Sequence, residues 1–115
     1  MTKTALFVFN GDPMCFIHVL LNALDMAQRG ETVKIVVEGA ATELVPALAN
    51  EKHPLYILWQ KVKDQGLVAG VCKACAKKTE ILEAAAEQGL ALLDAMNGHP
   101  SMAAYRETGY NIITF

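Results

Sequence analysis

Residues 67–76 of this chain read LVAGVCKACA, an apolar run followed at once by two cysteines three positions apart. Residues 67–71 have the length and composition of a buried strand, and from Ala74 onwards the pattern becomes helical. Cys72 therefore stands where a strand ends and a helix begins. The positive end of a helix dipole favours a thiolate, so the sequence predicts that the pKa of Cys72 is lowered.

The same alternation of strand and helix continues outward in both directions. Strands are predicted at residues 5–9, 32–37 and 110–115, and helices at residues 14–29, 42–49, 53–65, 74–88 and 101–108. Residues 89–96 remain ambiguous between a helix and a short buried strand. Continuous apolar strands that alternate with helices are typical of a parallel sheet covered by helices, an α/β fold.

Length and charge limit the class of protein. The chain has 115 residues, which fits a single domain, residues 1–115, and 53% of them are hydrophobic. A net charge of -2 without a basic cluster argues against nucleic acid as a partner. The longest apolar stretch is interrupted by His18 and Asn22, so no membrane span is expected. Three cysteines without a secretory signal predict reduced thiols and a cytoplasmic protein.

In a parallel sheet, the carboxyl ends of the strands meet at one edge, where ligands bind. Cys72 follows the third strand, and five further residues follow the first two strands or lie in the first helical turn. These candidate substrate-binding residues are Asn10, Gly11, Asp12, Cys15 and Gly39. Residues 10–12 could bind an anion, or they could only form the turn and cap the next helix.

The pair Cys72 and Cys75 has two interpretations. In one, Cys72 is a catalytic nucleophile and Cys75, one helical turn away, is a resolving thiol. The charges of Lys73, Lys77 and Lys78 would favour the thiolate. In the other interpretation, both cysteines are small buried hydrophobic side chains.

Metal and cofactor sites are not predicted. Structural zinc usually takes four ligands from two cysteine pairs, whereas this chain has one pair, Cys15 and scattered histidines. His99 precedes Pro100, which favours a turn role over catalysis. Neither G-x-G-x-x-G nor a Walker motif occurs, so no nucleotide cofactor is expected.

Four segments together resemble the DsrE-like family, which includes small sulfur-carrier proteins of sulfur oxidation and tRNA thiolation. They are LFVF at 6–9, residues 33–40, LVAGVC at 67–72 and MAAYRETGYNIITF at 102–115. The resemblance implies one domain with a five-stranded parallel sheet, helices on both faces, and residues 89–96 as the fourth strand. It also implies a homo-oligomer, either a trimer or a hexamer.

In the sulfur-carrier members, the cysteine after the third strand accepts a persulfide, and that position matches Cys72. The resemblance therefore implies a cytosolic sulfur carrier of sulfurtransferase type that exchanges sulfur with a donor or acceptor protein. The chain departs from the carriers at Cys75, a thiol that could discharge the persulfide as a disulfide. The alternatives are a thiol-disulfide redox protein that uses Cys72 and Cys75, or a non-enzymatic oligomeric module that binds a small ligand or a partner.

Overall fold

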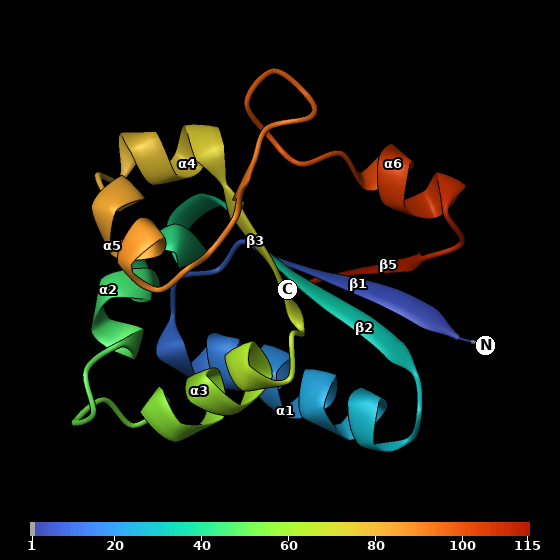
Figure 1. Ribbon diagram of the computed structural model, residues 1–115, viewed down its shortest axis with the longest axis horizontal. Coiled ribbons are helices and arrows are strands. Elements are labelled where there is room, and N and C mark those ends of the chain that lie inside the picture. The colour runs from blue at the N-terminus through green and yellow to red at the C-terminus, as the bar shows by residue number, and fades with distance from the viewer. Residues whose placement is uncertain (1) are drawn as a thin grey trace.

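The computed structural model describes residues 2–115 and contains a five-stranded parallel sheet, as predicted (Figure 1). The strands lie in the order β4-β3-β2-β1-β5. Their bounds are β1 (Lys3–Val8), β2 (Thr32–Val37), β3 (Val68–Cys72), β4 (Leu92–Leu93) and β5 (Asn111–Thr114). Every neighbouring pair runs parallel, so the carboxyl ends of the strands lie at one edge of the sheet.

Helices cover both faces of this sheet. They are α1 (Pro13–Gln28), the 3₁₀ helix η1 (Gly39–Leu44), α2 (Val45–Leu48), α3 (Tyr56–Asp64), α4 (Lys73–Lys78), α5 (Leu82–Glu87) and α6 (Met102–Glu107). Figure 1 shows α1 and α3 on one side of the sheet and α6 on the other. Within residues 2–115, no helix combines the length and the hydropathy needed to cross a bilayer.

The two faces have separate cores because side chains alternate along each strand. In β1, Leu6 and Val8 belong to the large core that also holds Trp59 of α3. Ala5 and Phe7 point to the other face, where Tyr105 of α6 packs edge-on against Phe7 with ring centroids 5.6 Å apart. The continuous apolar run in β1 thus reflects burial on both faces.

The structure corrects two details of the predicted helices. The predicted helix at 74–88 is two short helices, because Glu80 adopts a left-handed conformation with φ of 61° and ends α4. The buried face of α1 also differs from the face that the apolar spacing predicts, which is Met14, Ile17, Leu20, Leu21, Leu24 and Ala27. Its fully buried residues are Phe16, Val19, Leu20 and Ala23, whereas Met14 and Leu21 are exposed. The ambiguous segment 89–96 contains the short strand β4.

Candidate functional site

Four potential metal-ligating or nucleophilic side chains meet at the carboxyl edge of the sheet. They are Glu38 directly after β2, Cys72 at the end of β3, Cys75 in α4, and His99 in the loop between β4 and α6. One nitrogen, oxygen or sulfur atom from each lies within 4.8 Å of the corresponding atoms of the other three. The fold therefore gathers two thiols, an imidazole and a carboxyl group from three separate segments.

Cys72 is the centre of this cluster and is fully buried. Its Sγ caps α4 by accepting a hydrogen bond from the backbone N–H of Cys75 at 3.4 Å. The same sulfur lies 3.1 Å from Nδ1 of His99 and 3.7 Å from the carbonyl oxygen of Gly98. Cys72 thus has the predicted position at a strand-to-helix junction, with a histidine that the sequence did not associate with it.

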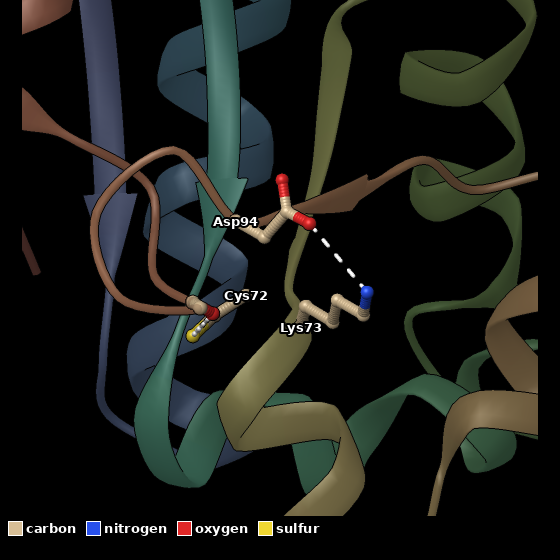
Figure 2. Close-up of polar contacts among 4 residues, drawn as sticks. Cys72, Lys73 and Asp94 are labelled. Atoms are coloured by element: carbon tan, nitrogen blue, oxygen red, sulfur yellow. Dashed lines mark hydrogen bonds and ion pairs between the residues drawn. The ribbon is translucent and has the colours of Figure 1, made fainter.

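The predicted lowering of the Cys72 pKa is wrong. Removal from solvent raises the pKa of the Cys72 thiol to about 12, and a side-chain hydrogen bond with Cys75 and the charge of Glu38 act in the same direction. The hydrogen bond from the backbone N–H of Cys75 lowers this pKa but does not offset the rise. Figure 2 shows why Lys73 does not counteract this effect: its side chain is directed toward Asp94, with Nζ 3.5 Å from Oδ2, and away from the Cys72 sulfur. Helix α4, whose dipole was expected to lower the pKa of Cys72, is only six residues long.

Glu38 is almost completely buried beside the cysteines. Desolvation raises the pKa of its carboxyl group, while the charge of His99 and a hydrogen bond with Cys72 partly oppose that rise. A buried carboxyl next to a buried thiol accumulates negative charge if both ionise. The cluster is therefore suited to a cation or to proton exchange with His99.

Backbone hydrogen bonds hold the loop that carries His99. His99 and Met96 exchange backbone hydrogen bonds of 2.7 and 2.9 Å, and the N–H of Ala74 donates to the carbonyl oxygen of Gly98 at 2.8 Å. The second bond ties the loop to the start of α4. His99 is thus positioned next to Cys72 by the backbone rather than by chance packing of a free side chain.

Two open cavities give access to the cluster. The larger, of about 660 Å³, is lined by Gly39, Ala40, Glu43, Ala74, Cys75, Lys78, Thr79 and His99. The smaller, of about 330 Å³, is lined by Phe9, Glu38, Met96, His99, Pro100, Ser101, Met102 and Ala103. His99 lines both cavities, Cys75 faces the larger one, and Cys72 faces neither.

The predicted substrate-binding residues divide into two groups. Gly39 lines the larger cavity, beside Cys75. Asn10, Gly11, Asp12 and Cys15 line neither cavity.

The roles of residues 10–12 in the structure are local. Asn10 Oδ1 accepts a hydrogen bond from the N–H of Asp12 at 2.8 Å, and Asp12 Oδ1 accepts one from Met14 at 2.9 Å, which caps α1. A Cβ at Gly11 would stand 2.7 Å from the carbonyl oxygen of Ala40, so this glycine permits the loop after β1 to approach the start of η1 closely.

His99 was missed as a site residue, and Glu38 was expected at this edge together with Gly39 but was not selected as a site residue. Glu38 follows the second strand directly, and the strand-end rule that selected Gly39 applied equally to it. His99 gave no such signal, because it lies in a loop 27 residues beyond Cys72. Only the tertiary fold brings it to the sulfur.

The fold and the site define a parallel α/β protein with a buried and a partly exposed thiol at the carboxyl edge of its sheet. The DsrE/DsrF-like family matches residues 3–115, and the chain belongs to this family, as the resemblance predicted.

Two uncharacterized proteins are similar to this chain in sequence. An uncharacterized protein of Methanocaldococcus jannaschii is 38% identical over 96 residues, which cover 84% of this chain and 76% of that protein. An uncharacterized protein of Archaeoglobus fulgidus is 42% identical over 40 residues, covering 35% of this chain and 66% of that protein.

A solved structure of a conserved protein of unknown function from Bacteroides thetaiotaomicron has the same fold. Its TM-score is 0.71 at 18% identity, and the match covers 98% of this chain and 94% of that one.

Proposed function

We propose that this protein is a sulfur-relay carrier that accepts a persulfide sulfur on its Cys72–Cys75 thiol pair. One observation carries the proposal: a thiol that faces an open cavity, Cys75, lies within 4.8 Å of a buried thiol, Cys72, that has its own histidine. Membership of the DsrE/DsrF-like family supports the same chemistry.

Access assigns the first step to Cys75. Its thiolate attacks the outer sulfur of a donor persulfide, the S–S bond of the donor breaks, and the donor leaves as a thiol. A persulfide on Cys75 results, and no net oxidation or reduction takes place. The buried position of Cys72 moves this first step away from the cysteine that the resemblance indicated.

Cys72 then acts as the second thiol. Its proton passes to Nδ1 of His99, 3.1 Å from the sulfur, and the resulting thiolate attacks the persulfide on Cys75. Attack on the outer sulfur transfers it to Cys72 and regenerates the Cys75 thiolate. Attack on the inner sulfur instead forms a Cys72–Cys75 disulfide and releases hydrosulfide.

Carriage of this kind needs partners and a reducing compartment. The donor and the acceptor are proteins with reactive thiols, and the carrier itself is proposed to work as a homo-oligomer, a trimer or hexamer, in the cytosol. All three cysteines of the chain are free thiols, as such a compartment requires.

Intact-protein mass spectrometry after incubation with a small persulfide donor tests the proposal. Wild type and Cys15→Ser are expected to gain the mass of one sulfur atom. Cys75→Ser should fail to load, and Cys72→Ser should load and keep the sulfur longer, because the resolving thiol is gone. Failure of wild type to load would contradict sulfur carriage.

The close approach of the two thiols also favours a second candidate, thiol-disulfide exchange. A protein of that kind would form the Cys72–Cys75 disulfide with an oxidised dithiol substrate and would lose two hydrogens without gaining sulfur. An oxidised dithiol offered in place of the persulfide donor identifies it, because the protein then loses two hydrogens without releasing the hydrosulfide that the carrier's own disulfide step produces. If the protein neither gains sulfur nor loses hydrogens, the binding-module interpretation remains.

A further inference from the structure

We propose that Glu38, Cys72, Cys75 and His99 form a binding site for one zinc-class divalent ion, and that the bound ion blocks sulfur loading. Metal binding does not depend on the proposed sulfur relay, whereas the block rests on it.

Geometry comes first. Zinc binds sulfur at about 2.3 Å and nitrogen or oxygen at about 2.0–2.2 Å in a tetrahedron, so its ligand atoms stand roughly 3.3–3.8 Å apart. All four candidate atoms already lie within 4.8 Å of one another, and Cys72 Sγ and His99 Nδ1 are 3.1 Å apart. Side-chain adjustments of about an ångström would complete the tetrahedron.

The donor set selects the class of ion. Two thiols and an imidazole are poor ligands for Mg²⁺ and Ca²⁺, which take oxygen ligands. The carboxyl group and the imidazole favour Zn²⁺ over Cu(I), which prefers sulfur alone. Two thiolates and the Glu38 carboxylate would bring three negative charges to the site. A bound divalent cation would neutralise two of them and leave the site with about one net negative charge.

Sequence spacing alone provides too few ligands for zinc. The Cys72–Cys75 pair supplies two ligands at helical spacing, but the third and fourth come from the end of β2 and from the loop before α6. No spacing rule in the sequence connects Glu38 with His99, because only the parallel sheet brings the two side chains together.

Contacts around the cluster hold the candidate ligands. The N–H of Cys75 donates to Cys72 Sγ at 3.4 Å, and Thr79 Oγ1 donates to the carbonyl oxygen of Cys75 at 2.9 Å. The Met96 and Gly98 backbone bonds fix the loop of His99. Outer contacts of this kind orient metal ligands.

Access is also present. Cys75 and His99 line the cavity of about 660 Å³, so a hydrated ion can reach one sulfur and one nitrogen before it meets the buried residues. Cys75 is also the thiol proposed to receive sulfur. A metal bound there would occupy its lone pairs, so metal and persulfide exclude each other at this sulfur.

Cobalt titration of the reduced, chelator-treated full chain tests the site. Co²⁺ is expected to bind one to one, with thiolate-to-cobalt charge-transfer absorption and the intense visible bands of tetrahedral coordination, and Zn²⁺ should displace it. Cys75→Ser and His99→Asn should each weaken Co²⁺ binding at least about tenfold. Circular dichroism checks that both variants are folded.

Two matched controls separate the site from nonspecific binding. Cys15→Ser removes a thiol of α1 outside the cluster, and His18→Asn removes an exposed imidazole of the same helix. Both should bind Co²⁺ like wild type. Wild-type binding no tighter than that of folded Cys75→Ser, or equal losses in the controls, overturns the proposal.

Sulfur loading with and without Zn²⁺ completes the test and distinguishes the two proposals. We expect the metal-free protein to gain one sulfur and the zinc-loaded protein to gain none. Loading of the metal-free protein without any cobalt or zinc binding overturns the metal site alone. Cluster-dependent metal binding without loading in the metal-free protein overturns the sulfur carrier alone, and loading unaffected by bound zinc overturns the block.

Discussion

At the residue scale, burial controls the chemistry of Cys72. In native protein at neutral pH, we expect an alkylating reagent to modify Cys75 at least about tenfold faster than Cys72, because each unit of pKa rise cuts the thiolate fraction about tenfold. The Cys72 thiol is also inaccessible. Timed labelling with peptide mapping measures both rates, and denaturant should bring them together. Faster native labelling of Cys72 would show that it is not buried in solution.

The raised pKa of Cys72 also predicts a pH dependence of stability. An unfolded cysteine ionises near pH 8.5, whereas burial raises the pKa of folded Cys72 to about 12. Between these values the folded state holds more protons than the unfolded state, so the free energy of unfolding falls as pH rises. The stability that the raised Cys72 pKa contributes is fully present below about pH 8.5. Denaturant titrations should show a steeper alkaline loss for wild type than for Cys72→Ser, and parallel curves would contradict the shift.

The residues of the site differ in how far the sequence predicts them. The position of Cys72 followed from local pattern, because strand and helix periods change at that residue. Its burial did not follow, because Gly98 and His99 close over the sulfur from a loop at least 26 residues away. Local pattern predicts backbone states, whereas pKa values depend on tertiary contacts.

At the element scale, Gln88 follows the last residue of α5 and joins that helix to α3 and α2. Its Oε1 accepts a hydrogen bond from the indole N–H of Trp59 in α3 at 2.8 Å, and its Nε2 donates to the carbonyl oxygen of Val45 in α2 at 2.8 Å. Gln88→Ala leaves the fully buried Trp59 N–H unpaired, so we expect a loss of roughly 1–3 kcal/mol of unfolding free energy. The exposed neighbour Glu87→Ala should change it by less than about 0.5 kcal/mol. Equal effects would contradict this role.

Gly70 allows β3 to approach β4. A Cβ there would stand 2.4 Å from the carbonyl oxygen of Ala91, which accepts the neighbouring Val71 hydrogen bond. The added methyl group in Gly70→Ala must displace Ala91 and the short edge strand β4 that follows it. We therefore expect a loss of roughly 1–3 kcal/mol of unfolding free energy. Gly66→Ala is the control, because it has a φ of +69° but open space around its Cβ. A larger loss at Gly66 than at Gly70 would exclude the close approach as the cause.

Elements were predictable where local signals agreed. Residues 32–37 form a strand as predicted. The face predicted near α3 was Leu55, Leu58, Trp59 and Val62, and all of these are buried except Leu58, which is partly buried. The break after α4 had no signal, because a left-handed residue is usually glycine or asparagine and here it is Glu80. Met14 and Leu21 were placed in the core because apolar residues run all around the start of α1.

At the scale of the whole molecule, the alternation of strands and helices predicted the parallel sheet and therefore the edge where the cluster lies. The homo-oligomer, by contrast, is implied by the resemblance to the DsrE-like family and stays a prediction. The sheet ends in two open edges, β4 and β5, and β5 carries the exposed Ile113. Edges of this kind are usually covered by another element or by a partner.

Exposed apolar side chains beside the site suggest where copies of the chain meet. Phe9 and Met96 are 38% and 52% exposed, and both line the cavity that contains Glu38 and His99. Met96 lies in the loop between β4 and α6, which projects beyond the sheet in Figure 1. A symmetric partner seated on this surface would bury both side chains and narrow the access to His99.

We therefore expect light scattering at micromolar concentrations to give a mass that is a multiple of 12.5 kDa. Met96→Asp should lower this mass, because a carboxylate buried in an apolar contact without a partner is strongly unfavourable. Ile57→Asp is the matched control, since Ile57 is 67% exposed on α3, which packs against the other side of the sheet. A monomeric wild type would contradict the oligomer. An oligomer that Met96→Asp leaves intact would move the interface away from the site, and His99 would then depend on its own chain alone for cover.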